Sequence, residues 1–488
     1  MKIRHLTPWS LVGRPRRGST VRFVALAMSL AMVAAACGGA DAPDAPSTTA
    51  ATAAPVTTAG AADAPAATVA EPVGMEVTAP EIPAKTVRFG MYPCCADQTH
   101  NQVAIVNGWY EEVGITLDPA DGHLYATFDQ ILPSMQRGDF DVAGTFIPGY
   151  LQTLDTFGMS LPPILFNDHY VGYAILAAPD SDVKTAQDFV DEGMSFGDAA
   201  AAAMEQLRGA EVYTPPHGQV QPPYPDVFLS YAGMSYPDDL NLVFLEDVKI
   251  VELSTQAGRV EFAIPYSAPV LVQMLRNGWK PVIETTDVLK DHGSEQATRM
   301  GQLVGSSGLF AQREWIDNEH DTVLRFLSVA FRTLAYLNDP ATQLDGFKAQ
   351  ADLMNAAQGL TLTPEEVGII WDKIDPMWIF EDQAQYLWDD PSAATHIKTG
   401  LDHKIQELIN NGTLTGDGNY DMDEFVVAED LFRELVALQA EAEGLFSEAQ
   451  GMSDLSASQQ GLVDEAQVWY DNYNFLDATR WLKAALGK

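Results

Sequence analysis

The folded part of this chain opens with the segment Val87-Arg88-Phe89-Gly90-Met91-Tyr92, which is typical of a β-strand. A helix is expected next, from about Thr99 to Val113, where Gly114 ends it. Ile115-Thr116-Leu117 then begins a second strand. Strands and helices that alternate at this spacing predict a mostly parallel sheet covered by helices.

The same alternation continues along most of the chain. We expect a helix over Phe128–Arg137 and a strand over Phe140–Gly144. Later strands are expected over residues 171–178, 210–213, 242–245, 261–265 and 281–284. Over residues 321–338 apolar side chains recur at helical spacing, and the chain beyond them is expected to be largely helical. Ligands bind at the carboxyl ends of strands in such sheets, so the loops after the strands are the first candidates for a site.

The composition is that of a large, acidic, globular protein. The chain has 488 residues, 47% of them hydrophobic, and a formal net charge of −39. Such a charge repels nucleic acid, so nucleic-acid binding is not expected. The three cysteines, Cys37, Cys94 and Cys95, are too few for a disulfide scaffold or a zinc site built from CxxC pairs. P-loop, nucleophile-elbow and HExxH motifs are absent, so we expect no catalytic residue, metal or cofactor.

Residues 1–36 have the features of a secretory signal peptide. A basic segment ends at Arg22, and an uncharged apolar run over residues 23–36 follows, too short to span a bilayer. The run ends in Ala34-Ala35-Ala36-Cys37, which resembles a bacterial lipobox and implies that Cys37 is lipidated after cleavage. Arg16-Arg17 leaves twin-arginine export open beside the general secretory route, which we favour.

A tether is expected between the anchor and the folded part. Residues 37–84 are mainly Ala, Thr, Pro, Asp and Gly, and they include no aromatic and no basic residue. Such a segment cannot bury enough apolar surface to offset its ordering entropy, so we expect it to be disordered. The protein is therefore expected outside the cytoplasm, held to the bacterial cell membrane by a lipid.

The order of segments resembles that of the substrate-binding proteins of ABC importers for nitrate, sulfonates, taurine and thiamine-precursor pyrimidines. The stretch Asn107–Ile115, for example, is similar to the family's helix end "-G-W/Y-x-E-E-x-G-I/L-". The other stretches that carry the resemblance are Val87–Tyr92, Gln136–Ala143, Gly172–Ala177, Asp182–Phe189, Gly258–Ile264 and Ile405–Phe425. Their fixed order carries the resemblance, which covers about residues 87–435.

The resemblance implies an α/β, two-lobed periplasmic-binding-protein fold with type II-like topology, whose cleft closes by a hinge motion. Lobe 1 would comprise residues 85–186 and 286–435, and lobe 2 residues 187–285. Residues 436–488 are expected to form a helical extension that packs on lobe 1, away from the cleft. The implied partners are a small-molecule ligand and the permease and ATPase subunits of an ABC importer. We expect a monomer.

The candidate ligand-binding residues lie in loops at strand ends of both lobes. They are Tyr92, Cys94, Cys95, Asp97, Gln98, Thr145, Phe146, Tyr170, His217, Gly218, Gln219 and Tyr266. Most are aromatic or amide groups, Asp168 lies nearby, and these loops contain neither Arg nor Lys. Because an oxyanion normally requires such a donor, we expect a neutral or cationic ligand with an aromatic ring that stacks on Tyr or Phe.

His100 and the neighbouring cysteines keep a second hypothesis open. Fungal pyrimidine-synthase relatives carry a cysteine-rich motif with an iron role, so the alternative is an enzyme or redox protein that uses His100, Cys94 and Cys95. The secretion signal argues against it, because that biosynthesis is intracellular. Whether the two cysteines form a disulfide in an oxidising compartment stays open at this point.

Overall fold

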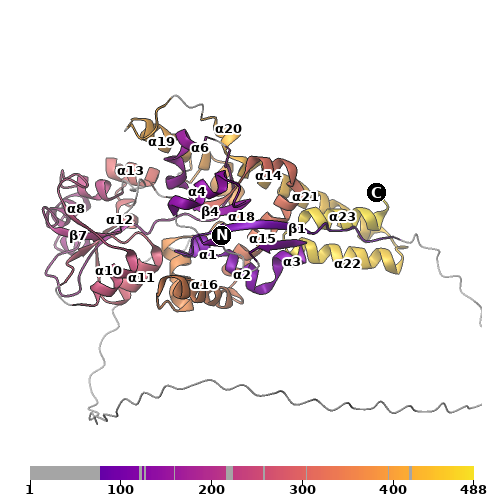
Figure 1. Cartoon of the computed structure of the whole chain (residues 1–488), viewed down its shortest axis with the longest axis horizontal. Helices are drawn as coiled ribbons and strands as arrows, with labels where there is room; N and C mark the ends of the chain where they lie inside the picture. Colours follow the sequence, from indigo (N-terminus) through magenta and orange to yellow (C-terminus); the bar gives the residue numbers. More distant parts are fainter. Residues whose placement is uncertain are drawn as a thin grey trace, which may run out of the picture. The chain divides into compact units, whose positions relative to one another are not determined.

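The computed structural model describes residues 77–119, 124–125, 128–158, 160–215, 224–256, 259–303, 305–393, 395–410, 412–416 and 420–488. It contains two separate sheets with helices around both (Figure 1), which confirms the expected α/β class. The expected leader, Cys37 and most of the expected tether lie outside the described residues, as do His217, Gly218 and Gln219. Within the described ranges, no helix is long and apolar enough to cross a membrane.

The first sheet contains the segment with which the folded part begins. Its strands are β1 (Lys85–Met91), β2 (Ile115–Asp118), β3 (Leu124–Tyr125), β4 (Val142–Phe146), β5 (Pro163–Phe166) and β11 (Ser307–Ala311). They run in the order β2-β1-β4-β11-β5, with β3 beside β1. Strand β1 is parallel to β2 and β4, whereas β11 is antiparallel to β4 and β5. Val87 and Phe89 of β1 are fully buried, as expected for a strand of a sheet that helices cover.

The second sheet repeats this order. Its strands are β6 (Ala174–Ala177), β7 (Glu211–Thr214), β8 (Asn241–Phe244), β9 (Phe262–Ala263) and β10 (Lys280–Glu284). They run in the order β10-β6-β9-β7-β8; β7 is parallel to β8 and β9, and β6 is antiparallel to β9 and β10. In both sheets the antiparallel strand, β6 or β11, is the one that the chain enters on crossing from the other sheet.

The two crossing segments touch each other. The chain leaves β5 for β6 through residues 167–173 and returns from β10 to β11 through α12 (Thr285–Val288) and α13 (Glu295–Leu303). The backbone N–H of Tyr170 donates to the carbonyl oxygen of Gly305 at 2.8 Å. The expected lobe 1 ran to residue 186 and so included β6, but pairing with β9 and β10 places β6 in the second sheet. An apolar run has the same pattern whichever sheet buries it, so the sequence did not show that the chain passes to the second sheet before β6.

Helix α3 (Trp109–Glu112) packs against β2, and α15 (His320–Asn338) packs against α3 and α2 (Asn101–Asn107). The ring of Phe326 in α15 lies 5.8 Å from that of Phe89 and 5.1 Å from that of Tyr110. The expected helix over residues 99–113 is divided, because Gly108 adopts a left-handed conformation with φ of 71°. The other helices before residue 426 are α1 (Ala96–Thr99), α4 (Phe128–Gln136), α5 (Ile147–Leu151), α6 (Leu154–Phe157), α7 (Ala186–Asp191), α8 (Phe196–Glu205), α9 (Tyr224–Ser230), α10 (Asp247–Ser254), α11 (Ala268–Arg276), α14 (Arg313–Asn318), α16 (Gln343–Gln358), α17 (Pro364–Ile369), the π-helix η1 (Ile370–Ile374), α18 (Phe380–Gln383), the π-helix η2 (Ala384–Trp388), α19 (Ile397–Asn410) and α20 (Met422–Phe425).

The C-terminal part consists of helices α21 (Val427–Gly451), α22 (Ala457–Asp471) and α23 (Phe475–Leu486), labelled together in Figure 1. A buried ion pair joins α23 to α15: the guanidinium of Arg325 donates to both carboxylate oxygens of Asp477 at 2.8 Å. The expected helical extension is present. It has no boundary at residue 436, because α21 is continuous from residue 427.

Candidate ligand-binding site

Three aspartates from distant parts of the chain meet at the carboxyl edge of the first sheet. Asp97 lies in α1, directly after β1; Asp168 follows β5; and Asp375 follows η1. One carboxylate oxygen of each lies within 4.8 Å of the others, and all three side chains are at least nine-tenths buried. We call these three residues the acidic cluster.

The topology explains why these residues meet. Strands β1, β4 and β5 point the same way, since β11 is antiparallel to both of its neighbours, so the loops after them share one edge. Asp375 is brought there by backbone pairing: Asp168 and Met377 form an isolated antiparallel bridge, and the N–H of His169 donates to Pro376 at 2.9 Å. These contacts hold Asp168, in the crossing segment, next to Asp375, which lies far away in the sequence.

The acidic cluster has few hydrogen-bond donors. Gln98 donates through Nε2 to Asp97 Oδ2 at 2.7 Å, and the backbone N–H of Ser307 donates to Asp168 Oδ1. Asp168 Oδ2 and both oxygens of Asp375 are buried and accept no bond from any described N–H or O–H group. A carboxylate oxygen of Asp168 and one of Asp375 lie within 4.8 Å of each other, so each charge disfavours ionisation of the other.

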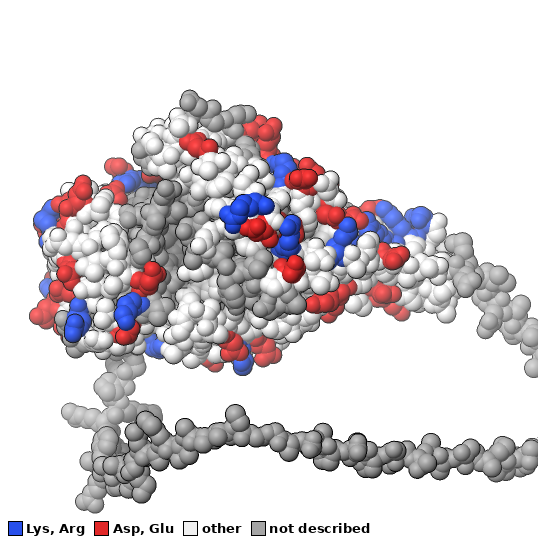
Figure 2. Space-filling view, viewed as in Figure 1, with Lys and Arg blue, Asp and Glu red and all other residues white. Residues whose placement is uncertain are grey.

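Burial raises the pKa of Asp97, and burial together with the neighbouring carboxylates raises the pKa values of Asp168 and Asp375. Among the described residues, no Lys or Arg forms an ion pair with any of the three. On the face shown in Figure 2, the basic side chains lie among acidic ones at the surface. The unliganded acidic cluster therefore holds protons at a pH at which ordinary aspartates are ionised.

A group of tyrosines lies at the facing edge of the second sheet. Tyr173 precedes β6, Tyr224 begins α9, and Tyr266 follows β9. The rings of Tyr173 and Tyr224 stack with centroids 4.0 Å apart, and Tyr266 lies 5.4 Å from Tyr224. Tyr170, in the crossing segment, lies 4.9 Å from Tyr173. We call these four residues the tyrosine group.

The acidic cluster and the tyrosine group are neighbours. The negative charges of Asp375 and Asp168 add to burial in raising the pKa of the Tyr173 hydroxyl. The hydroxyl of Tyr170 donates to the carbonyl oxygen of Tyr266 at 3.2 Å and so joins the crossing segment to the second sheet. The two carboxyl edges thus meet at a site with carboxyl groups on one side and phenol rings on the other.

Several of the residues that were predicted to bind ligand lie at this candidate site. Asp97 is a member of the acidic cluster, Gln98 donates to it, and Tyr170 and Tyr266 are in the tyrosine group. The ring of Phe146, at the end of β4, meets that of Tyr170 edge-on at 6.4 Å.

Other predicted residues are placed differently. Thr145 is buried in β4 opposite Gly308. Tyr92 is half-buried, and its carbonyl oxygen accepts from the N–H of Cys94 at 2.8 Å. His217, Gly218 and Gln219 lie outside the described residues, so their place in the site stays a prediction.

The adjacent cysteines form a disulfide in the turn before Asp97, with the two sulfur atoms 2.08 Å apart. His100 is buried, and burial lowers its pKa to about 4, so its ring is neutral at physiological pH. Its Nδ1 contacts the carbonyl oxygen of Asp97 at 2.6 Å and its Nε2 contacts Asn101 at 3.2 Å. Both ring nitrogens are therefore engaged within the loop.

Sequence reasoning missed Asp375, Tyr173 and Tyr224. Asp375 follows a helical segment, where no strand end marks a site, and only the bridge to Asp168 brings it to the sheet edge. The sequence around Asp168 does resemble a strand end, because polar residues follow a short apolar run there. No strand was expected over residues 163–166, however, so Asp168 was not assigned to the site. The tyrosines are indistinguishable from core residues by pattern alone.

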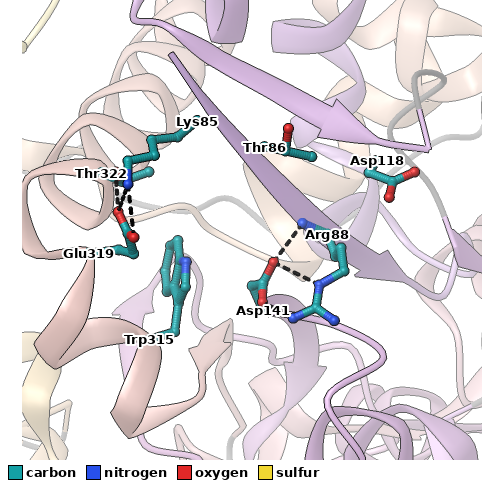
Figure 3. A pocket seen from close by; sticks show the side chains of 8 residues that line it. All are labelled: Lys85, Thr86, Arg88, Asp118, Asp141, Trp315, Glu319 and Thr322. Atoms are coloured by element: carbon teal, nitrogen blue, oxygen red, sulfur yellow. Dashed lines mark hydrogen bonds and ion pairs between the residues drawn. The ribbon is translucent and has the colours of Figure 1, made fainter. Parts of the chain in front are cut away.

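A cavity of about 310 Å³ lies at the opposite, amino edge of the first sheet (Figure 3). Four of its charged side chains form ion pairs, Lys85 with Glu319 at 2.8 Å and Arg88 with Asp141, and Asp118 also lines it. The cavity lies at the starts of β1 and β4, away from the strand ends where ligands bind in such sheets. Both of its basic side chains already have acidic partners, so we place the candidate site at the carboxyl edge.

No family model matches the sequence, and no curated protein matches it. Solved structures similar to this chain include the periplasmic aliphatic sulphonate binding protein SsuA from Escherichia coli, at 14% identity and a TM-score of 0.46, over 70% of this chain and 91% of that one. Another is the periplasmic nitrate-binding protein NrtA from Synechocystis PCC 6803, at 14% identity and a TM-score of 0.43, over 73% and 89%. A third is the desulfurization enzyme DSZB, at 14% identity and a TM-score of 0.44, over 72% and 99%. The proteins similar to this chain thus include the sulfonate and nitrate binding proteins that its sequence resembles, and also an enzyme.

Proposed function

We propose that this protein is an extracytoplasmic solute-binding protein that holds a small molecule between the carboxyl edges of its two sheets and delivers it to an ABC importer. One observation carries the proposal: the crossing segments bring the acidic cluster and the tyrosine group together where the two edges meet. Ligands of such sheets bind at the carboxyl ends of strands, and a few converging polar groups among aromatic ones are typical of a small-molecule site. Opening at the crossing segments would admit the ligand and closing would enclose it.

The contacts around His100 favour binding over catalysis. Its two ring nitrogens are engaged within their own loop, and its lowered pKa leaves it a poor proton acceptor at neutral pH. Cys94 and Cys95 are bonded to each other and present no thiol. The enzyme or redox alternative would require these groups to be released first.

Membrane attachment through Cys37 and a flexible tether forms part of the same proposal. The sequence before the first described residues carries the lipobox-like segment and the tether composition. Among the first described residues, Val77 and Ile82 pack against the C-terminal helices. The remaining partners would be the permease and ATPase of the importer.

A ligand screen tests the proposal. The purified protein is heated with neutral heteroaromatic compounds, organic cations, sulfonates or nitrate, and each hit is titrated by calorimetry. A true ligand at a hundred times its Kd is expected to add about 2.7 kcal/mol to the free energy of unfolding. Phe146→Ala is expected to weaken binding of that ligand, whereas Glu319→Gln, in the amino-edge cavity, should bind it as the wild type does. The absence of any hit, or equal affinity in Phe146→Ala, would count against a ligand site at the carboxyl edge.

A further inference from the structure

We infer that the ligand is an organic cation whose charged group carries N–H donors, such as a protonated amine, an amidine or a guanidine, attached to a flat apolar body. The inference rests on the proposed function and names the class of solute that the site would take. It is argued from three features of the site: its unpaired oxygens, the lack of a basic partner for its carboxyl groups, and its aromatic wall.

The buried polar atoms of the site are short of donors. Five buried oxygens from four side chains lack a hydrogen-bond partner among the described residues: Gln98 Oε1, Asn167 Oδ1, Asp168 Oδ2, and Oδ1 and Oδ2 of Asp375. The side chains are at most 2% exposed. Buried acceptors are nearly always satisfied, so a set of this kind requires a donor from elsewhere.

These oxygens belong to one place in the molecule. Gln98 touches the carboxylate of Asp97 through its amide nitrogen, and a side chain at Gly144 would bring a Cβ within 2.6 Å of Gln98 Oε1. Asn167 precedes Asp168 and donates through Nδ2 to the carbonyl oxygen of Asp97 at 3.1 Å. A carbonyl oxygen can only accept, so the amide nitrogen of Asn167 must face it and the amide oxygen must be the unpaired atom.

The carboxyl groups of the site also lack a basic partner among the described residues. A buried carboxylate requires a cation, a set of donors or a proton, and the acidic cluster brings three carboxyl groups together without a described Lys or Arg. A bound ammonium or amidinium supplies both the positive charge and two or more N–H groups. An anionic ligand would add charge of the same sign to the cluster.

The aromatic wall points to an organic cation independently of the carboxyl groups. Tyr170, Tyr173, Tyr224 and Tyr266 present a continuous set of ring contacts beside Asp168 and Asp375. Ring faces attract cations and stack on flat apolar groups. A metal ion gains nothing from such a wall, whereas an organic cation uses both the rings and the carboxylates.

One set of matched probes separates the possible ligand classes. Benzamidine, benzamide and benzenesulfonate share a ring and differ in the charge of the head group, and benzyltrimethylammonium carries the charge without an N–H donor. Calcium and zinc chlorides test the metals alone. Each probe is titrated by calorimetry into the wild type, Asp375→Asn and Asp372→Asn. Asp372 is exposed in η1, three residues before Asp375, so it provides the same substitution outside the site.

The expected result is binding of benzamidine and of related amines, with neutral and anionic probes much weaker. Removing one partner of a buried charge pair costs binding free energy, so Asp375→Asn should lower the affinity for benzamidine by roughly thirtyfold or more. Asp372→Asn should leave that affinity unchanged. Asp168→Asn, expected to act in the same direction, gives a second variant if Asp375→Asn does not fold. Tighter binding of benzyltrimethylammonium than of benzamidine would contradict the inference that the ligand donates N–H groups to the site.

Two outcomes overturn the inference and leave the proposed function standing. One is tight binding of benzamide or benzenesulfonate that Phe146→Ala weakens and Asp375→Asn does not. The other is binding of calcium or zinc alone, lost in Asp375→Asn, with no organic probe bound more tightly than the metal. If no probe binds and the wider screen also yields no ligand, the proposed function fails with the inference.

Discussion

Replacing Asp375 with asparagine is expected to stabilise the unliganded protein at neutral pH. Neither oxygen of Asp375 accepts a described hydrogen bond, and burial with the nearby charges of Asp168 and Asp97 raises its pKa. Because the pKa is higher in the folded state, the stability that its proton supplies is complete below the unfolded value of about 4. That stability is lost as pH rises through the folded pKa. Asparagine carries no charge at any pH, so the variant avoids the loss.

The magnitude follows from burial. An unsatisfied buried acceptor costs about 1–3 kcal/mol, and a charged one more, so Asp375→Asn should gain at least that amount once the wild-type carboxyl group is ionised. An unfolding entropy of about 2.1 cal/mol/K per residue, over the roughly 400 described residues, gives about 0.8 kcal/mol/K. The gain of about 1–3 kcal/mol then corresponds to a rise in Tm of about 1–4 °C.

The assay is calorimetric melting of the wild type, Asp375→Asn and Asp372→Asn across a series of pH values from 4.5 upward. The Tm difference between Asp375→Asn and the wild type should grow with pH and be smallest at the acid end, where Asp375 is protonated. The other titratable groups facing the site, Asp97, Asp168 and the neutral His100 and His169, are common to all three proteins. A Tm that falls in Asp375→Asn at neutral pH, or a difference that does not change with pH, would refute the reasoning.

Three further changes test other parts of the structure. Asp477→Asn leaves Arg325 buried without its partner and should lower the free energy of unfolding by about 3–5 kcal/mol in chemical denaturation; a loss below about 1 kcal/mol would mean that α23 is not integral to the fold. Tyr266→Ala removes one ring of the aromatic wall and should weaken the identified ligand about twofold to tenfold by titration, without unfolding the protein; unchanged affinity would remove Tyr266 from the site. Cys37→Ser should release the protein from the membrane fraction into the medium, and a wild type already found free in the medium would disprove the lipid anchor.

Local pattern predicted the elements of the fold better than their pairing. The strand over Val87–Tyr92 and the helix over residues 321–338 match β1 and α15 closely, because their apolar residues recur at the period of the element. The run over residues 171–178 was expected as a strand, and β6 lies within it, but nothing in its apolar residues shows which sheet receives it. Sheet membership is decided by partners far away in sequence, namely β9 and β10.

Members of the candidate site were predicted mainly at strand ends. Asp97 comes after β1, Phe146 ends β4 and Tyr266 comes after β9, so all three lie at carboxyl edges. Asp375 has no such marker: its position depends on backbone pairing between residues 168 and 377. The sequence therefore indicated a neutral or cationic ligand from the absence of basic residues, but it did not show that three carboxyl groups converge.

The position of Tyr170 explains how the charge of a ligand would be coupled to closure. Tyr170 and Asp168 are two residues apart on one crossing segment: the hydroxyl of Tyr170 reaches Tyr266 beside the second sheet, whereas Asp168 accepts from the N–H of Ser307 in the first sheet. A ligand that contacts carboxylates and rings together gains both sets of contacts only when the two edges meet. Its binding therefore favours the closed arrangement by the difference between its affinities for the closed and open forms. A ligand that contacts the tyrosine group alone lacks the carboxylate part of that difference, so the cationic group of the solute would determine how completely the protein closes.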